Sequence, residues 1–295
     1  MDQFRRGELT FPVLDAGPQD AGPESTVVLL HGFPQTSAAW SGVAPRLNAA
    51  GLRTLAPDIR GTAPLARPAA REAYRMKHLV GDVIALLDAA GLDSAHLVGH
   101  DWGGGIAWAT ALRHPERIRS LTALSTPHPA AMTWAGRHST QALKSWYMFA
   151  MQVPFVPERL LATGVRRRGL GGLGLPEEHQ LLYRRRFGEV AAMAGALGPY
   201  RGMLAGSRRR RPNASAASSH GSEQARPGEA AALVTVPTTY MWGNRDPYLG
   251  RAAAERTGLY CEDDYRFVEL DADHWLPEKH PARVADEIRG RVSGA

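Results

Sequence analysis

The chain has 295 residues, of which 44% are hydrophobic and 22% are charged, a balance typical of a soluble globular protein. Its length fits one large α/β domain with an inserted subdomain, or two small domains. A single cysteine, Cys261, excludes an internal disulfide, and the lack of a long apolar run excludes a membrane-spanning helix and an N-terminal export signal. We therefore expect a cytoplasmic protein without a membrane partner.

The formal net charge of +6 reflects arginine clusters at residues 166–168, 184–186 and 208–211. Such clusters can bind nucleic acid or an anionic membrane surface. However, no aromatic residues interleave with them, as a single-strand binder requires, and no helix-turn-helix or zinc-finger spacing is present. The sequence therefore predicts no nucleic acid partner.

The first part of the chain predicts strands that alternate with helices. Residues 9–14 fit an edge strand, and residues 26–30 form a continuous apolar run typical of a strand buried on both faces. A helix over 37–50 and a strand over 53–56 follow, and the apolar residues of 74–90 fall on one face of a helix. This alternation predicts the α/β class, with a doubly wound, mostly parallel sheet.

A strand, a sharp turn and a helix are predicted around Asp101. Gly99, Asp101 and Gly103 follow a short apolar run and have the spacing of a nucleophile elbow, in which glycines remove Cβ atoms that would clash around the turn. The same residues also fit a plain glycine-rich helix start with the aspartate as N-cap.

The aspartate at the centre of this turn indicates the chemistry. A serine that attacked saturated carbon would leave an ether, whereas an aspartate leaves an ester that water can cleave. The N-terminus of the following helix favours the ionised carboxylate. Asp101 is therefore predicted to be a nucleophile that forms an alkyl-enzyme ester.

The alternation stops after a strand over residues 118–124. Residues 128–231 contain helix-like stretches and no clear strand, and the part from about 208 to 231 is rich in Arg, Ser, Ala and Gly and is predicted to be a flexible linker. The chain is thus predicted to consist of a core made of residues 1–127 and 232–295 and a helical cap over 128–231.

The C-terminal part supplies two further catalytic candidates. Asp246 follows a strand predicted over residues 234–241, and His274 follows a strand predicted over 265–270, which gives the chain order nucleophile, acid, histidine. A histidine with an ordinary pKa near 6.5 can take a proton from water at neutral pH, and a carboxylate on its other nitrogen fixes the tautomer. Two helices complete this part of the chain, over residues 249–257 and 281–292.

Residues 99–104, Gly-His-Asp-Trp-Gly-Gly, together with residues 31–35, His-Gly-Phe-Pro-Gln, resemble the α/β-hydrolase-fold epoxide hydrolases and the related haloalkane dehalogenases. The resemblance covers most of the chain and implies an α/β-hydrolase fold with an inserted helical cap. It also implies an oxyanion hole made by the backbone N–H groups of Phe33 and Trp102, and a cis peptide bond before Pro34.

Two further residues, Asp58 and Arg60, match the pattern of this family. We interpret them as a buried pair that orders their loop, and not as catalysts.

The resemblance further implies two cap tyrosines above the nucleophile. Tyr147 matches the first and Tyr200 the second. An epoxide oxygen leaves as an alkoxide, which needs a proton or a strong hydrogen bond, and a tyrosine with a pKa near 10 can supply it. Trp102, Phe33 and Phe149 are expected to line an apolar cleft that binds the substrate.

The predicted function is therefore epoxide hydrolysis to a vicinal diol, through an aspartyl ester that a His/Asp-activated water hydrolyses. The expected partners are a small apolar epoxide and water, no metal or organic cofactor is required, and the chain is expected to be a monomer or a homodimer.

Two other functions remain open from the sequence. A haloalkane dehalogenase uses the same aspartate but needs N–H donors for the halide; Trp102 fits one of them, and no second donor is evident. A fold relative that binds a small ligand without turnover is the other possibility, because fold alone does not establish catalysis.

Overall fold

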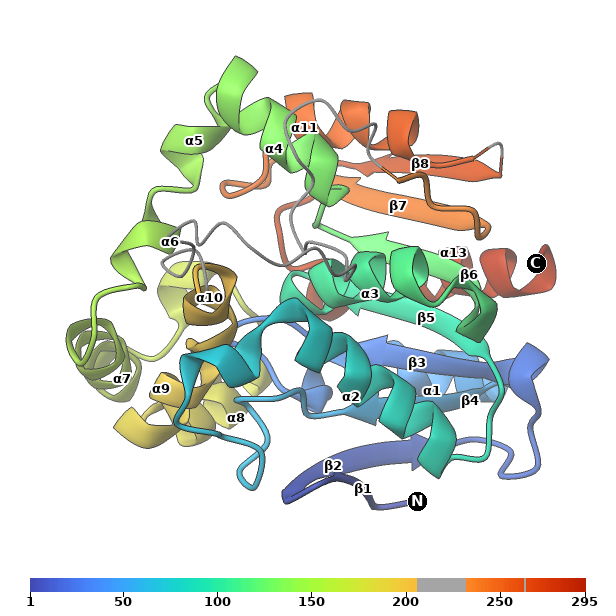
Figure 1. The fold of residues 1–295 in the computed structure, drawn as a ribbon, viewed down its shortest axis with the longest axis horizontal. Helices are drawn as coiled ribbons and strands as arrows, with labels where there is room; N and C mark the ends of the chain where they lie inside the picture. The colour runs from blue at the N-terminus through green and yellow to red at the C-terminus, as the bar shows by residue number, and fades with distance from the viewer. Residues whose placement is uncertain (206–231, 263) are drawn as a thin grey trace, which may run out of the picture.

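The computed structural model describes residues 1–205, 232–262 and 264–295 (Figure 1). Within these residues the strands form one eight-stranded sheet in the order β1-β2-β4-β3-β5-β6-β7-β8. The pairs β1–β2 and β2–β4 are antiparallel, and every pair from β4 across to β8 is parallel, which confirms the predicted mostly parallel sheet. The strands are β1 (Gln3–Arg6), β2 (Leu9–Ala16), β3 (Thr26–Leu30), β4 (Arg53–Pro57), β5 (Ala95–His100), β6 (Ile118–Leu124), β7 (Thr238–Gly243) and β8 (Tyr265–Leu270).

Helices cover both faces of the sheet, α2 and α3 on one face and α1 and α13 on the other (Figure 1). Leu97 and Val98 are neighbours in β5, yet Leu97 packs in the apolar cluster of the first face and Val98 in that of the second. Because successive strand side chains point to opposite faces, a sheet covered on both sides requires such unbroken apolar runs. The helices of this part are α1 (Ala44–Ala49), α2 (Met76–Ala89), α3 (Trp102–Arg113), α11 (Arg251–Arg256), α12 (Leu276–Lys279) and α13 (Pro281–Ser293).

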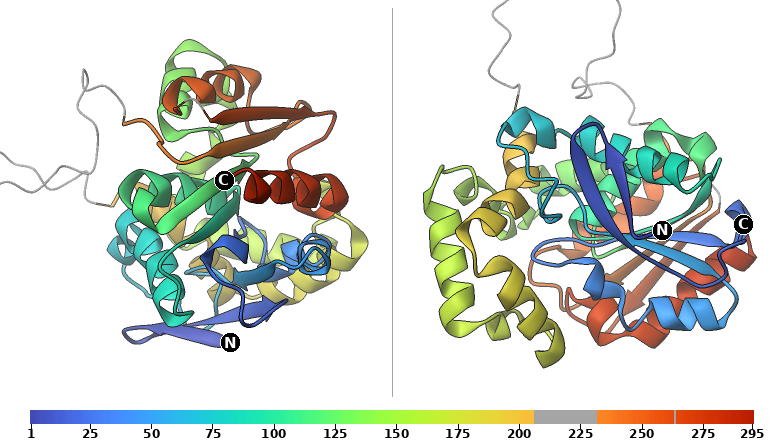
Figure 2. Two further views of the ribbon diagram at one scale, coloured as in Figure 1. Left: turned by 90° about the vertical axis from the view of Figure 1, so that its right-hand side faces the viewer. Right: turned by 90° about the horizontal axis from the view of Figure 1, so that it is seen from below.

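Between β6 and β7 the chain forms helices α4 to α10, which we call the cap. These helices lie towards one end of the sheet in Figure 1, where α4 lies beside α11, and the right-hand view in Figure 2, from below, shows the yellow-green to gold helices α7, α8 and α9 beside the sheet. Buried cap side chains such as Phe187 and Leu197 pack with Trp275 of the core. The cap helices are α4 (Pro129–His138), α5 (Gln141–Lys144), α6 (Tyr147–Ala150), α7 (Val156–Arg168), α8 (Glu177–Phe187), α9 (Val190–Ala196) and α10 (Gly198–Met203).

The fold is thus an α/β-hydrolase fold with an inserted helical region, as the sequence predicts. The division into a core of residues 1–127 and 232–295 and a cap of 128–231 stays a prediction. The predicted linker over residues 208–231 lies outside the described residues.

Three details of the predicted secondary structure are wrong. The strand predicted over residues 234–241 is β7, which begins only at Thr238, directly after Pro237, and ends at Gly243. Residues 9–14 belong to β2, but β2 has a neighbour on each side, and β1 is the edge strand. Residues 37–50 do not form one helix: a 3-10 helix over Ser37–Trp40 ends before α1 begins. Pro45 in the first turn of α1 accounts for the break, because its nitrogen has no hydrogen to continue an earlier helix.

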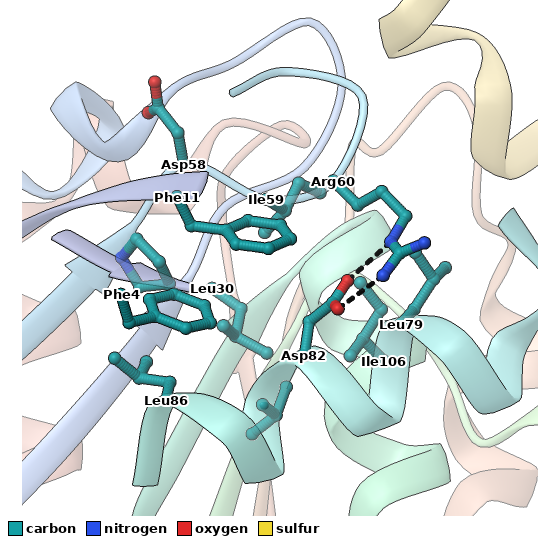
Figure 3. A pocket seen from close by; sticks show the side chains of 12 residues that line it. Phe4, Phe11, Leu30, Asp58, Ile59, Arg60, Leu79, Asp82, Leu86 and Ile106 are labelled. Carbon is teal, nitrogen blue, oxygen red and sulfur yellow. Dashed lines mark hydrogen bonds and ion pairs between the residues drawn. The ribbon is translucent and has the colours of Figure 1, made fainter. Parts of the chain in front are cut away.

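The loop after β4 is held by two separate ion pairs. Arg60 forms a bidentate pair with Asp82 of α2, with distances of 2.7 Å from Nε to Oδ2 and 2.6 Å from Nη2 to Oδ1 (Figure 3). Asp58 points away from Arg60, accepts the N–H of Ser37 at 2.9 Å and pairs with Arg186 of the cap at 3.1 Å. Asp58 and Arg60 are therefore both buried and both order this loop, as predicted, although each does so through partners of its own.

Candidate active site

Asp101 lies at a strained turn between β5 and α3. Its φ of 52° and ψ of −118° are unusual for a residue with a side chain. A Cβ on Gly99 would lie 2.2 Å from the backbone oxygen of Gly103, and a Cβ on Gly103 would lie 2.1 Å from that of Leu30. The two glycines are therefore required for the close approach of backbone segments that presents Asp101, as expected of a nucleophile elbow.

His274 lies between two carboxylates. Its Nδ1 is 2.7 Å from Oδ2 of Asp246, and its Nε2 is 3.6 Å from Oδ2 of Asp101. The other oxygen of Asp246 accepts the backbone N–H groups of Tyr248 at 2.7 Å and Leu249 at 2.9 Å, which fixes the carboxylate. The structure thus brings together the three residues predicted from the ends of β5, β7 and β8.

The charges of this group stabilise one another. Burial favours a neutral imidazole, but the carboxylates of Asp246 and Asp101 outweigh it and raise the pKa of His274 to about 10. Burial alone would raise the pKa of Asp101, but contact with His274 and the N–H of Phe33 hold that pKa below its usual value. These shifts favour an ionised Asp101 beside a protonated His274 at neutral pH.

The turn after β3 faces the nucleophile. The backbone N–H of Phe33 donates to Oδ1 of Asp101 at 2.8 Å, and the Phe33–Pro34 peptide bond is cis, as predicted. A Cβ on Gly32 would lie 2.3 Å from the Cβ of Asp101, so only glycine allows this approach. Trp102 is the first residue of α3, where backbone N–H groups have no partner within the helix, but its share in an oxyanion hole stays a prediction.

Asp101, His274 and the predicted tyrosines Tyr147 and Tyr200 line one cavity of about 230 Å³. The rings of Tyr147, from α6, and Tyr200, from α10, lie 6.3 Å apart. Burial first, and then the charge of Asp101, raise the pKa of both phenols above the usual value, so both keep their proton at neutral pH. Gln152 donates to the backbone oxygen of Tyr200 at 2.6 Å and so fixes its position in the cap.

Tyr248 also lines the cavity, although the sequence analysis does not single it out. Its ring meets the ring of His274 edge-on at 5.1 Å and that of Tyr147 at 5.9 Å. Its place two residues after Asp246, in the loop that follows β7, is a sequence signal that could have identified it. The apolar lining of the cavity comes mainly from the cap, with Met151, Leu161, Val165, Leu170, Leu173 and Met193.

Two residues expected to line the cleft do not line this cavity. Phe149 is 69% exposed, whereas Tyr147, two residues earlier on α6, lines the cavity. Two positions apart on a helix correspond to a rotation of about 200°, so the two side chains lie on nearly opposite sides of the helix. The ring of Trp102 packs edge-on against that of Tyr200 at 4.9 Å, and Tyr200 supplies the cavity wall there. Phe33 lines the cavity as expected.

In the described part of the chain, no group of three or more His, Cys, Asp or Glu side chains is arranged to hold a metal ion. No helix among the described residues combines the length and the apolar character that a membrane span needs.

The fold and the site together define a class of protein. A doubly wound sheet carries a nucleophile on a strained turn after β5, an acid after β7 and a histidine after β8, and a helical insertion covers them. This combination of topology and chain order is that of the α/β hydrolases.

Comparison with known proteins refines this class. Residues 25–281 match the profile of the alpha/beta hydrolase fold family. The AB hydrolase superfamily protein YfhM of Bacillus subtilis is 31% identical over 284 residues, which cover 94% of this chain and 92% of that relative. Epoxide hydrolase A of Mycobacterium tuberculosis is 30% identical over 312 residues, which cover 96% of this chain and 94% of the relative.

A solved structure agrees with these relatives. The crystal structure of epoxide hydrolase A from Mycobacterium thermoresistibile matches with a TM-score of 0.77 and 26% identity, over 99% of this chain and 97% of that one. The chain therefore belongs to the epoxide hydrolase family of the α/β-hydrolase fold.

Proposed function

We propose that this protein hydrolyses an epoxide to a vicinal diol through a covalent ester on Asp101. The observation that carries the proposal is that two protonated phenols, Tyr147 and Tyr200, share one cavity with an ionised aspartate nucleophile. An alkoxide leaving group needs such proton donors, whereas a halide leaves as an anion without them.

The first half-reaction opens the ring. Oδ1 of Asp101 accepts the N–H of Phe33 at 2.8 Å, so we assign the attack to Oδ2, which lies 3.6 Å from Nε2 of His274. The carboxylate oxygen attacks one carbon of the epoxide ring, and the bond between that carbon and the epoxide oxygen breaks as the new C–O bond forms. A proton from a tyrosine neutralises the departing oxygen. The product of this step is a hydroxyalkyl ester of Asp101.

The second half-reaction cleaves the ester. Esterification removes the negative charge of Asp101, one of the two charges that raise the pKa of His274, so the imidazolium becomes a stronger acid. We infer that its proton neutralises the tyrosinate, which leaves His274 as the base that activates water. The N–H groups of Phe33 and Trp102 would then stabilise the tetrahedral oxyanion.

The cavity also indicates the kind of epoxide. Its polar lining consists of Asp101, His274 and the tyrosines, whereas the rest of its lining is mainly aliphatic, thioether and aromatic side chains, most of them from the cap. A substrate with the epoxide at one end and an apolar substituent at the other matches this division. We propose this class of substrate, with water as the second reactant.

A single-turnover reaction in heavy-oxygen water tests this proposal. Ester cleavage at the Asp101 carbonyl puts the heavy oxygen on Asp101, so the first diol formed carries none of it. Heavy oxygen in that first diol, with none in the Asp101 peptide, would mean that water attacks the epoxide directly. A bromoalkane in the same assay tests the dehalogenase alternative, and binding of both compounds without any product would support a non-catalytic ligand-binding protein.

A further inference from the structure

A buried acid that the proposed mechanism does not use lies behind the active site. Glu278 belongs to α12, four residues after His274, and is only 8% exposed. Its Oε1 accepts hydrogen bonds from Nε2 of Gln35 at 2.6 Å and from the hydroxyl of Tyr183 at 3.2 Å, whereas its Oε2 is buried and has no hydrogen-bond partner among the described residues. Tyr183 lies on α8, so this carboxyl group joins the cap to the core.

Gln35 connects Glu278 to the nucleophile. Its Oε1 accepts the backbone N–H of Gly32 at 2.7 Å and lies 2.9 Å from Nδ1 of His100. A backbone N–H can only donate, so the amide oxygen must face Gly32 and the amide nitrogen must face an acceptor, which Glu278 supplies.

Two residues of the active site depend on this amide through their neighbours. Gly32 precedes Phe33, whose N–H holds Asp101, and His100 precedes Asp101 itself. The other ring nitrogen of His100 lies 2.9 Å from the backbone oxygen of His274. A shift of the Gln35 amide would therefore displace the N–H that positions the nucleophile.

We propose that Glu278 is a positioning residue for ring opening: its ionised carboxylate fixes the Gln35 amide and, through it, the N–H of Phe33 against Asp101. This inference rests on the proposed function. A hydrogen bond to a charged acceptor is roughly twice as strong as a neutral one, so protonation of Glu278 weakens the hold on Gln35. A proton on Oε2 would also be buried without an acceptor.

The surroundings of Glu278 allow this change near neutral pH. Burial raises the pKa of Glu278 to about 7, although Gln35, Tyr183 and the charge of His274 each act to lower it. The titratable groups that face it are Tyr183 from α8, His274 from the loop before α12 and, one hydrogen bond further through Gln35, His100 from β5. The neighbouring Lys279 is paired with Asp273 instead.

The test is the rate of ester formation in a single turnover, measured by intact mass from pH 5 to 9 with styrene oxide as probe. This step does not use His274 as a base, and the pKa of Asp101 lies below this window. In the unchanged protein we expect the rate to fall by about two- to tenfold as the pH drops through 7. Glu278→Gln, which keeps the acceptor but has no charge, should react at the slower rate throughout this range.

A second variant covers the case in which Glu278→Gln does not fold. Tyr183→Phe removes a donor that lowers the pKa of Glu278, so the fall in rate should move to higher pH. If Glu278 had only a structural role, the pH at which the rate falls would not change.

Glu287→Gln is the matched control, because Glu287 is a buried glutamate on α13 that pairs with Arg266 and Arg283 away from this network. Its pH profile should equal that of the unchanged protein. The inference would be overturned if the rate of ester formation in Glu278→Gln fell with pH as it does in the unchanged protein. It would also be overturned if the fall in Tyr183→Phe occurred at the same pH as in the unchanged protein. Failure of every variant and of the unchanged protein to form an ester would instead contradict the proposed function.

Discussion

Asp101, Asp246 and His274 come from strand ends of the sheet, whereas Tyr147 and Tyr200, which face them across the cavity, come from helices of the cap. The sheet side is held by backbone geometry: a strained turn, required glycines and backbone N–H groups that bind both carboxylates. The cap side is held by helix packing and a few side-chain bonds such as that from Gln152 to Tyr200.

The two regions also differ in surface character. Residues 129–203 carry ten Arg or Lys against four Asp or Glu and include most of the large hydrophobic side chains that are exposed, Trp146 and Phe149 among them. The sheet buries its apolar runs on both faces. This contrast teaches that Asp101, Asp246 and His274 lie where backbone contacts fix each position, whereas Tyr147, Tyr200 and most of the apolar pocket lining belong to helices held by side-chain packing.

The largest effect is expected from the sheet side. Asp101→Ala should abolish diol formation, because among the described residues no other carboxylate lines the cavity and could form the ester. The measurement is turnover of styrene oxide by chromatography. Asp271→Asn is the control, since Asp271 is close to His274 in sequence but its side chain is 76% exposed, and it should retain full activity. Full activity in Asp101→Ala would contradict the mechanism.

A smaller loss is expected from the cap side. Tyr147→Phe and Tyr200→Phe should each slow ring opening by about a hundred- to ten-thousandfold, the usual contribution of one general acid. Rapid-quench measurement of ester formation checks this. Tyr265→Phe, in which the removed hydroxyl has no hydrogen-bond partner in the structure, is the matched control. Unchanged rates in both cap variants would remove the tyrosines from the mechanism.

An ion pair between two strands of the sheet predicts an effect on the free energy of unfolding. Asp15 of β2 forms a bidentate pair with Arg53 of β4, at 3.0 and 2.8 Å, with a side chain that is 1% exposed. Asp15→Asn should lower the free energy of unfolding by about 3–5 kcal/mol, because it leaves a buried guanidinium unpaired. Urea unfolding measures the loss. The exposed pair of Asp286 and Arg289 is the comparison, and Asp286→Asn should change stability by less than about 1 kcal/mol.

The same pair gives a pH dependence. Burial would raise the pKa of Asp15, but Arg53 and the terminal amine of Met1 outweigh it and lower the pKa to about 2, from a usual value of 3.8. Because the pKa is depressed in the folded state, the stabilisation is present above pH 3.8 and is lost as the pH falls through 2. Asp15→Asn should lack this component, and an identical acid-unfolding curve for both proteins would refute it.

The smallest effect is expected from the outer face of the cap. Phe149→Ser should leave kcat and KM for an epoxide within about twofold, because the side chain points away from the cavity. A large rise in KM would show that Phe149 contacts the substrate after all and would revise the position of α6.

The sequence predicts the sheet side of the site well and the cap side only in part. Gly99, Asp101 and Gly103 predict the elbow because only glycine fits the close backbone contacts. Asp246 and His274 were found because each follows a predicted strand. In contrast, the apolar side chains of the cap lie both inside and outside, so hydrophobicity alone misplaces Phe149 and does not find Leu161 or Leu173.

Long-range partners are the other limit of the sequence analysis. Arg60 pairs with Asp82 of α2 and Gln35 with Glu278 of α12, and neither bond leaves a signal in local spacing. The position of Tyr248 two residues after Asp246 could have identified it as a site residue, but nothing in the sequence shows that its ring contacts that of His274.

The most direct test of the ester on Asp101 is the intact mass of His274→Gln after incubation with styrene oxide, followed by peptide mapping. Without the base, ring opening proceeds and ester cleavage stalls, so we expect an added mass equal to the whole epoxide, located on the peptide that contains Asp101. His96→Gln, which changes a buried histidine of β5 outside the cavity, is the control and should turn over without accumulating the adduct. Continued diol release by His274→Gln without an adduct, or an adduct on another residue, would contradict the account.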